Sequence, residues 1–513
     1  MQLIFAASDG PMTDTMEMLT GTAIRGLNIL GSLFLFVLGV LAAIIIVTFI
    51  IDITQTKDTV RRNYPVLGRF RSFFSKLGEF FRQYFFAMDR EEMPFNRAQR
   101  DYISDVCDDG HETVPFGSTK VLAPGEAIFA NGMFPKLEGE HSPKPPYIIG
   151  KDSENPYAPT SLFNISAMSY GSLSKPAIQA LSHGAQMAGC WLNTGEGGVS
   201  PYHLEGECDI VYQLGTGKFG ARNEDGTLDA EKLRKTCEDN PDIKMIEIKL
   251  SQGAKPGKGG ILPAEKVTAE IAEIRGIKVG EAAISPNRHV DAGNPSELLD
   301  LIHDIREASG RPTGIKFVVG NIAPIQELVA EIKKRGHGSA PDFITVDSGD
   351  GGTGAAPLPL LDNMGLSIRE GLPLMDDLLR EEGLRERIAL IATGKLVTPA
   401  DVAWAFCVGA DFVNAGRGFM FALGCIQALK CDENTCPTGI TTHNKRLQRG
   451  LDPTNKAVRV MNYCKTIQKE VEMIAHSCGV DHPHDLTRDH VMIVQASGRS
   501  KPFSQTWDMS RYM

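Results

Sequence analysis

The stretch GIKFVVGNIAPIQELVAEIKKRGHGSAPDFITVDSGDGGTG, residues 314–354, decides the fold. The apolar run GIKFVVG is followed by PIQELVAEIKKRG, an amphipathic segment of helical length, and then by a second apolar run, DFITVD. Strands that alternate with helices in this way indicate a parallel β-sheet. The glycine-rich run SGDGGTG comes directly after the second strand, and such a run suggests a backbone loop that approaches a ligand.

The same alternation extends to both sides of this stretch. Further candidate strands are LFNISAM (162–168), IEIKL (246–250), EAAIS (281–285), IALIAT (388–393) and DFVNAG (411–416). Seven or eight such units over roughly 300 residues predict a closed (β/α)8 TIM barrel, which we place at residues 151–445. A doubly wound open sheet is the alternative, but no strand–GxGxxG–helix fingerprint supports it.

Polar or glycine-rich residues follow the predicted strands. In a barrel these positions form the C-terminal face, on which active sites are built. They are Ser169, Glu196, Lys249, Lys316, Asp350, Thr393 to Lys395, and Gly416 to Gly418. The loops after the last two strands are the usual phosphate site of a barrel, and Lys395 and Arg417 would add positive charge there. A phosphorylated ligand is therefore expected, and FMN is the natural candidate.

Three cysteines, Cys425, Cys431 and Cys436, lie in GCIQALKCDENTCPTGITTH, residues 424–443. Their spacing is C-x5-C-x4-C, and closely spaced thiolates of this kind hold iron–sulfur clusters. Buried structural thiols are the alternative, because free cysteine is among the most buried residue types. A disulfide framework is disfavoured in a large chain that is mostly cytosolic in character.

An uncharged apolar run near the start of the chain predicts a membrane anchor. Residues 26–51 read GLNILGSLFLFVLGVLAAIIIVTFII, and about 20 apolar residues suffice to cross a bilayer. We place the transmembrane helix at residues 26–52; a buried core helix and a signal peptide are the alternatives. Basic residues are concentrated after the run, so the positive-inside rule predicts an extracytoplasmic N-terminus at residues 1–25. The protein would be a single-pass protein of the inner (cytoplasmic) membrane with its catalytic domain in the cytoplasm.

Two further segments flank the predicted barrel. Residues 53–150 are expected to form a juxtamembrane and barrel-capping segment, and residues 446–513 a helical C-terminal extension. The stretch GRFRSFFSKLGEFFRQYFF, residues 68–86, mixes aromatic with basic residues. It is interpreted either as an interfacial helix on an anionic leaflet or as a helix docked on the main domain. The formal net charge of −10 disfavours nucleic-acid binding.

Several motifs together resemble a known family. They are FNISAMSYGSLS (163–174), NTGEGG (193–198), IEIKLSQGAKPGKGGILP (246–263), DGGTGAAP (350–357) and ALGCIQALKCDENTCPTG (422–439). The set resembles the FMN-binding synthase domain of glutamate synthases, and most closely its short membrane-anchored members. The resemblance implies a glutamate synthase-like oxidoreductase that reduces 2-iminoglutarate, formed from 2-oxoglutarate and ammonia, to glutamate. It also implies FMN in the barrel and a [3Fe–4S] cluster on Cys425, Cys431 and Cys436.

The resemblance assigns roles to individual residues. Glu196, Lys249 and Lys255 would be catalytic, with Glu196 near the flavin and the entry of ammonia. The residues expected to bind FMN are Ala167, Met168, Ser169, Gln213, Lys249, Lys316, Asp350, Gly351, Gly352, Gly394, Lys395, Gly416 and Arg417.

Two positions depart from the family pattern. Ile261 stands in GGILP where the family has a glutamine that contacts the oxo acid. An aliphatic side chain cannot replace the hydrogen-bond donor and acceptor of the glutamine amide. Lys218 stands where the family often has arginine, so two-pronged carboxylate binding is lost. The 2-oxoglutarate assignment is weakened by these changes, whereas the FMN assignment is not.

The expected partners follow from what the motifs lack. No glutamine amidotransferase pattern and no second dinucleotide site precede or follow the barrel motifs. Ammonia would come from solution or from a separate subunit, and electrons from an external donor; homo-oligomerisation is left open. Two alternatives remain: an FMN oxidoreductase on a different amino or oxo acid coupled to a membrane redox partner, and a non-catalytic electron-transfer subunit.

Overall fold

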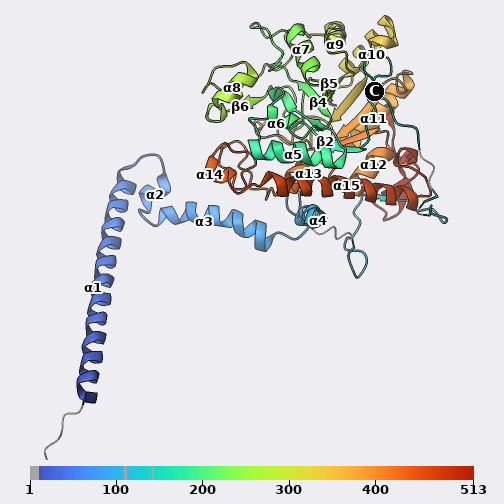
Figure 1. Ribbon diagram of the computed structural model, residues 1–513. Helices are drawn as coiled ribbons and strands as arrows, with labels where there is room; N and C mark the ends of the chain where they lie inside the picture. Colours follow the sequence, from blue (N-terminus) through green and yellow to red (C-terminus); the bar gives the residue numbers. More distant parts are fainter. Residues whose placement is uncertain (1–10, 109–112, 138, 141–143, 513) are drawn as a thin grey trace, which may run out of the picture. The chain divides into compact units, whose positions relative to one another are not determined.

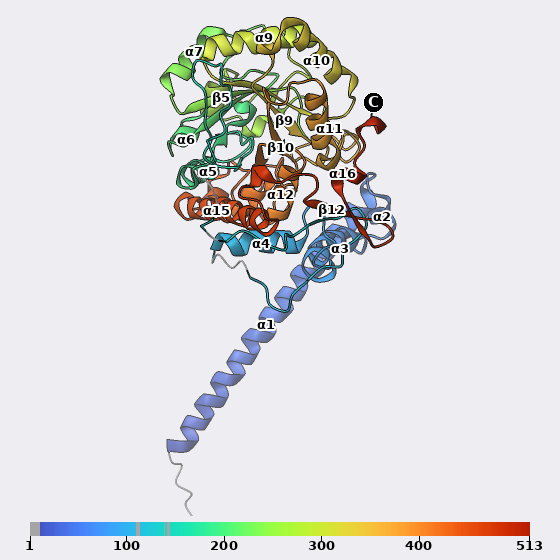
Figure 2. The same ribbon diagram turned by 90° about the vertical axis from the view of Figure 1, so that its right-hand side faces the viewer.

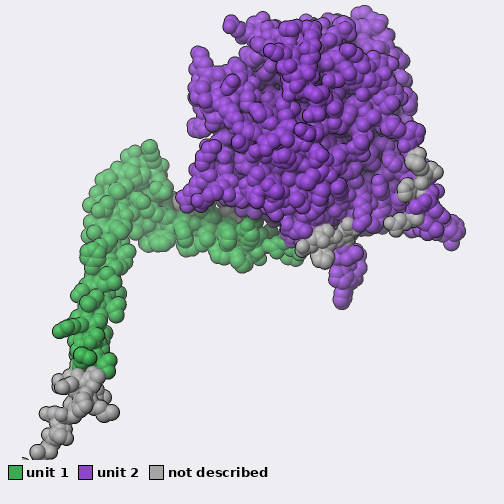
Figure 3. All heavy atoms as spheres, in the orientation of Figure 1, with its two compact units in different colours: residues 1–97 green, residues 98–513 purple. Residues whose placement is uncertain are grey.

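The computed structural model describes residues 11–108, 113–137, 139–140 and 144–512. The chain divides into two compact units, Met1–Arg97 and Ala98–Met513 (Figure 3). Each unit is described by itself.

The first unit is helical. It contains α1 (Pro11–Thr54), α2 (Thr59–Asn63), α3 (Gly68–Phe81) and a π-helical turn, η1 (Arg82–Phe86). Helix α1 is long and apolar enough over Met18–Thr54 to cross a membrane. The helix starts well before the predicted limit at residue 26, because no proline interrupts the sequence between Met12 and Thr54. Residues 1–10 of the predicted extracytoplasmic segment lie outside the described residues.

The second unit is built on a closed parallel barrel, so the predicted (β/α)8 TIM barrel is confirmed (Figures 1 and 2). Its strands are β2 (Phe163–Ile165), β3 (Leu192–Asn193), β4 (Ile210–Leu214), β5 (Ile243–Lys249), β8 (Thr313–Val318), β9 (Phe343–Asp347), β10 (Ala389–Thr393) and β11 (Phe412–Ala415). They pair in this order, and β11 closes the ring against β2 through Val413–Phe163 and its neighbours.

Helices surround these strands (Figure 2). The longer ones are α5 (Lys175–Ala188), α7 (Ala230–Asp239), α9 (Pro295–Ser309), α10 (Ala323–Arg335), α11 (Ile368–Glu381) and α12 (Pro399–Cys407). The shorter ones are α6 (Pro201–Leu204), α8 (Ala269–Arg275), α13 (Arg417–Ala422), α14 (Lys445–Gln448) and α16 (Phe503–Thr506). Several begin at an N-cap side chain followed by proline, as at Ser174 in α5 and Asn294 in α9.

One predicted strand was wrong. The segment EAAIS does not join the barrel: β7 (Ala283–Ile284) pairs with β6 (Ile261–Leu262) in a separate antiparallel hairpin. The barrel uses β3 and β4 instead. Strand β3 has only two residues, too few to produce a recognisable apolar pattern in the sequence.

The interior of the barrel is apolar at the N-terminal ends of the strands. A buried cluster there contains Ile149, Tyr157, Trp191, Val211, Met245, Phe343, Ala389, Ile391 and Phe412. Above this floor lies the buried carboxylate of Glu247 on β5. It accepts hydrogen bonds from Asn193 Nδ2 (2.8 Å), Gln213 Nε2 (2.5 Å) and Thr345 Oγ1 (2.6 Å). The barrel core therefore changes from apolar to polar toward the C-terminal ends of the strands.

The expected segment boundaries need two corrections. Residues 98–108 belong to the barrel unit, because α4 (Arg97–Asp108) buries Ile103 and Val106. The C-terminal extension is also not purely helical. Helix α15 (Pro453–Ser477) packs against α5, but β12 (Val491–Val494) then pairs with β13 (Ser500–Pro502) and with β1 (Ala127–Phe129), because its β-branched and apolar residues favour a strand.

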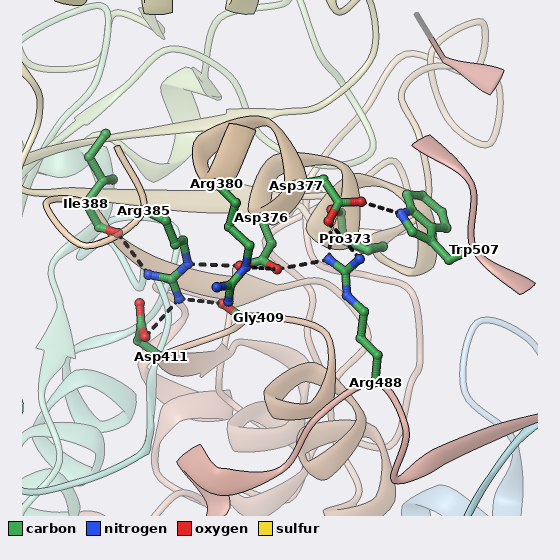
Figure 4. Close-up of polar contacts among 10 residues, drawn as sticks. All are labelled: Pro373, Asp376, Asp377, Arg380, Arg385, Ile388, Gly409, Asp411, Arg488 and Trp507. Carbon is green, nitrogen blue, oxygen red and sulfur yellow. Dashed lines mark hydrogen bonds and ion pairs between the residues drawn. The ribbon is translucent and has the colours of Figure 1, made fainter. Parts of the chain in front are cut away.

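A network of ion pairs ties the C-terminal segment to the barrel (Figure 4). Asp376 on α11 is buried and accepts from Arg380, Arg385 and Arg488, each at 2.9 Å. Arg385 also contacts Asp411, whose other carboxylate oxygen accepts the Leu390 N–H at 2.7 Å. The guanidinium of Arg385, shortly before β10, is thus shared between the buried carboxylates of Asp376 on α11 and Asp411 immediately before β11.

We expect Arg385→Met to lower the free energy of unfolding by about 3–5 kcal/mol, because it leaves two buried carboxylates without their shared cation. Arg380→Met is the matched control. It removes another partner of Asp376, but the Arg380 side chain is 56% exposed, so its loss should cost only about 0.2–1 kcal/mol. Chemical denaturation followed by tryptophan fluorescence measures both values. Equal losses for the two variants would contradict this interpretation.

Candidate active site

The C-terminal mouth of the barrel contains a partly buried ion pair. Glu196 lies in a short 3-10 turn, Gly195–Gly197, directly after β3, and Lys249 is the last residue of β5. Their Nζ and Oε2 atoms are 3.0 Å apart, and the two side chains are only 10% and 18% exposed. Lys249 Nζ also donates to the side-chain oxygen of Gln252. Two of the three predicted catalytic residues are therefore in direct contact.

Further cations surround this ion pair. Lys255 is buried and lies close enough to Glu196 and Lys249 for both charges to influence its pKa. Arg275, at the end of α8, is also buried near Glu196 and lies over the Phe219 ring at 5.2 Å. Arg275 Nη2 donates to the Tyr170 carbonyl, whereas its Nε has no hydrogen-bond partner among the residues that the structure describes. The site can thus attract a small polyanion.

The charges at this site shift the pKa values of its groups. Burial alone raises the pKa of Glu196, but Lys249 and the other nearby cations outweigh it and hold the pKa below its ordinary value. Burial, followed by repulsion from Lys249, lowers the pKa of Lys255 to about 8. At neutral pH Glu196 is therefore an ionised proton acceptor, and Lys255 is a cation that loses its proton slightly above neutrality.

A glycine makes this packing possible. A side chain at Gly260 would collide with the carboxylate of Glu196. Gly260 leads into β6, so the next residue, Ile261, lies in the strand that passes beside Glu196. The Ile261 side chain is 43% exposed, and its cross-strand partner Ile284 is 66% exposed. This hairpin adds an apolar edge next to the charged site.

The centre of the mouth is a second group of polar side chains. Lys316 Nζ, on β8, lies 3.4 Å from Asp347 at the end of β9. Burial alone lowers the pKa of Lys316, but Asp347 and Glu247 raise it above its ordinary value. The predicted cofactor residue Gln213 contacts Glu247 just below. The charge of Glu196 also helps to raise the pKa of Lys316, so the two groups are close enough to interact electrostatically.

The glycine-rich loops form the opposite side of the mouth. Gly394 (φ 123°) leaves no space for a side chain, because a Cβ there would collide with the hydroxyl of Ser348. Ser348 Oγ and Asn414 Oδ1 are buried and have no hydrogen-bond partner among the described residues. The side chain of Arg417 packs against Gly352 and donates to the Asp350 carbonyl, and burial lowers its pKa to about 10. These loops offer unused donors and acceptors to a polar ligand.

The remaining predicted cofactor residues lie around this ring. Ala167, Met168 and Ser169 follow β2, and the Met168 carbonyl accepts a hydrogen bond from His203 Nε2 at 2.8 Å. The Met168 side chain lies close to Gly416. Gly351 lies against Asp347 and Gly253, and Lys395 follows β10 with φ 53°. Each predicted residue is thus at the carboxyl end of a barrel strand or in the loop that follows.

The three cysteines lie in an irregular loop after α13. Three non-glycine residues of this loop, Gln427, Leu429 and Asn434, have φ between 54° and 58°, which is uncommon and often marks a functional segment. Burial raises the pKa of Cys425 to about 11, and the other two thiols add to the shift. Among the described residues no three His, Cys, Asp or Glu side chains cluster tightly enough to hold a single metal ion.

This cysteine loop is bound to the mouth of the barrel by two contacts. Lys266, buried just after β6, donates from Nζ to the carbonyls of Cys431 and Thr441, both at 2.7 Å. His443 Nε2 lies 2.8 Å from the Gly171 carbonyl in the loop after β2. The cysteines are therefore attached to the same loops that carry the charged site.

Sequence reasoning missed several residues of the site. Arg275 stands in an ordinary amphipathic helix, Glu247 inside an apolar strand, and Lys266 in a loop, so no local pattern distinguishes them. His289, whose Nε2 lies 3.0 Å from the Lys249 carbonyl, was also missed. Lys218, singled out as a replacement for arginine, is buried and pairs with Asp291 at 2.6 Å.

The chain is similar to proteins of known family. The model of the conserved region in glutamate synthase matches residues 127–481. A glutamate synthase large subunit-like protein, YerD, of Bacillus subtilis is 37% identical over 92% of this chain and 97% of its own length. An archaeal-type glutamate synthase [NADPH] of Thermotoga neapolitana is 36% identical over 61% of this chain, and this chain matches 59% of that protein. The archaeal glutamate synthase [NADPH] of Methanocaldococcus jannaschii is 37% identical over 62% of this chain and 59% of its own length. The chain belongs to the glutamate synthase family.

Proposed function

We propose that the chain is an FMN- and iron–sulfur-dependent oxidoreductase that reductively aminates 2-oxoglutarate, through 2-iminoglutarate, to glutamate. The ion pair of Glu196 with Lys249, set among further buried cations, carries this proposal. Two carboxylates of the oxo acid need positive charge, and the chemistry at the carbonyl carbon needs a proton acceptor and a donor. Ammonia and electrons would come from outside the chain.

The residues of the mouth fit FMN. Gly394 and the neighbouring glycine-rich loops let the backbone approach a ligand, and the unpartnered Ser348 Oγ and Asn414 Oδ1 can hydrogen-bond to it. Lys395 and Arg417 would provide positive charge for the phosphate, and Lys316 would help to hold the cofactor at the centre of the mouth. When bound, reduced FMN supplies the hydride for reduction of an imine.

The charged side chains have distinct roles in this scheme. Arg275 and protonated Lys255 would hold the carboxylates of the substrate. Ionised Glu196 would accept a hydrogen bond from ammonia and orient it for attack on the carbonyl carbon. Lys249 would hold the Glu196 carboxylate in place and keep it ionised. The side chains of Glu196 and Lys249 have low solvent exposure, which strengthens the electrostatic interaction between them.

The cysteine loop fits an iron–sulfur cluster. Cys425, Cys431 and Cys436 would each bind a different iron of a [3Fe–4S] cluster, so their sulfur atoms need not converge on one point. When bound, the cluster supplies one-electron transfer. The contacts of Lys266 and His443 support this proposal, because they hold the loop next to the residues expected to bind FMN.

We also propose that α1 anchors the protein in the inner (cytoplasmic) membrane. Its length, its hydropathy and the absence of burial in its apolar window support a membrane span. Basic residues after the span favour a cytoplasmic location for the catalytic unit. Cleavage of α1 as a signal sequence is the alternative, and the size of the membrane-bound protein distinguishes the two.

A second candidate function rests on Ile261. An apolar side chain next to Glu196 favours an amino or oxo acid without a distal carboxylate, with electrons exchanged with a membrane redox partner.

A turnover assay separates the two functions. Protein purified anaerobically and supplied with 2-oxoglutarate, ammonium and a reduced viologen dye should form glutamate. Ile261→Gln should raise kcat/KM for 2-oxoglutarate about 10- to 100-fold, because the amide can hydrogen-bond to the charged substrate. Ile284→Gln, on the partner strand, should leave the value unchanged. Absence of glutamate with both the parent protein and Ile261→Gln would refute the proposed substrate.

The pH profile tests the role of Lys255. Only the protonated amine attracts a carboxylate, so kcat/KM for the oxo acid should fall as pH rises above the pKa of about 8, by up to tenfold per pH unit. Lys255→Arg should move this fall to higher pH, because arginine stays protonated. Lys258→Arg, an exposed change in the same loop, should leave the profile unaltered. A profile that Lys255→Arg does not change would exclude this role.

The visible and electron paramagnetic resonance spectra test the cofactors. The parent protein should show flavin bands together with a broad iron–sulfur absorption. Cys431→Ser should lose the iron–sulfur absorption and keep the flavin bands. Cys478→Ser, a buried cysteine outside the loop, should keep both. A parent protein that contains flavin but no iron or sulfide after anaerobic purification would count against the cluster.

A further inference from the structure

Helix α3 and the turn η1 present an aromatic surface to solvent. We call it the aromatic stripe; its members are Phe70, Phe73, Phe74, Phe80, Tyr84 and Phe85. Each of these side chains is between 44% and 67% exposed. At 100° per residue all six fall on one side of the helix. Their rings form two groups in contact, Phe70 with Phe73 and Phe74, and Phe80 with Tyr84 and Phe85; the Phe80 and Tyr84 centroids are 4.8 Å apart. Such a surface is expensive to expose to water, so it indicates a binding partner.

Basic residues border the stripe on both sides. At 100° per residue, Arg71 and Arg82 lie along one edge and Lys76 lies along the other, whereas Ser75 lies on the polar side. Residues 68–86 contain four basic residues against one acidic residue. An apolar stripe between two cationic edges matches the boundary between acyl chains and anionic headgroups. A second copy of the chain fits this surface poorly, because pairing two stripes would bring like charges together.

A buried ion pair connects α3 to the end of α1. The Asp52 side chain is 1% exposed, and its carboxylate accepts from Arg69 Nη2 at 2.8 Å and from the backbone N–H of Val66 at 3.0 Å. Arg69 Nε donates to the same carboxylate at 2.9 Å. The start of α3 is therefore held next to the last turn of the helix proposed to cross the membrane. In a protein anchored by α1, this contact would keep the start of α3 beside the membrane surface.

We propose that α3 and η1 form an interfacial helix on an anionic membrane, with the aromatic stripe inserted at the acyl boundary and the basic edges against lipid phosphates. This inference depends on the proposed anchoring by α1. The inference goes beyond that anchoring, because it assigns to the protein a second, peripheral contact with the membrane that prefers negatively charged lipids.

Tryptophan fluorescence in brominated lipid tests the proposal. The full chain carrying Phe74→Trp is reconstituted in vesicles of phosphatidylcholine and phosphatidylglycerol with brominated acyl chains, which quench only nearby indoles. The parent protein supplies the background from its three native tryptophans. Phe74→Trp should give blue-shifted emission that is quenched severalfold more than that of Ser75→Trp, the matched control one residue away on the polar side.

Charge and anchoring are tested separately. Replacing Arg71, Lys76 and Arg82 by glutamate in the Phe74→Trp protein, or omitting phosphatidylglycerol, should abolish most of the additional quenching. Co-flotation of the triple-glutamate protein with vesicles that lack phosphatidylglycerol reports on α1, because the peripheral contact is removed under these conditions. Loss of co-flotation would overturn the anchor and this inference together. Retained co-flotation with equal quenching at positions 74 and 75 would overturn only the interfacial helix. Blue-shifted emission of Phe74→Trp without quenching would also overturn it, because that result indicates that the aromatic stripe is covered by a protein partner.

Discussion

The carboxylate of Glu247 connects four strands of the barrel from inside. It accepts from Asn193 on β3, Gln213 on β4 and Thr345 on β9, and it belongs to β5 itself. A buried carboxylate is tolerated only when its oxygens are satisfied, so these hydrogen bonds hold the strands in register at that level. Below it, large apolar side chains fill the barrel; above it, Lys316, Asp347, Lys249 and Glu196 are packed as charged neighbours. The chemistry of the mouth depends on this transition.

The sequence predicts the fold and the ring of loops well, because helix and strand patterns are local. The runs that became β5, β8, β9, β10 and β11 are apolar and are bounded by polar or glycine-rich residues, so their strands and the side chains after them could be placed. Other features depend on contacts between distant segments. Strand β3 is too short to be recognised, EAAIS pairs outside the barrel, and β12 pairs with β1, which lies before the barrel strands in the sequence. Arg275 and Lys266 acquire their roles solely from burial against other loops.

One short segment connects the charged site with the cysteine loop. Gly260 packs on Glu196, and Lys266 only six positions later donates to the carbonyl of Cys431. Strand β6 lies within this segment, so the exposed Ile261 is connected along the backbone to the ion pair on one side and to the cysteine loop on the other. The segment thus joins the charged site to the cysteine loop, and burial of Lys266 at its end lowers the pKa of that amine.

The pairing of β1 with β12 has a consequence for biosynthesis. Helix α1 leaves the ribosome well before β12 is made, and β12 follows every strand of the barrel in the sequence. The small sheet that contains both β1 and β12 can therefore form only after the barrel strands have been synthesised, so the segment before the barrel waits for the segment after it before it can pair.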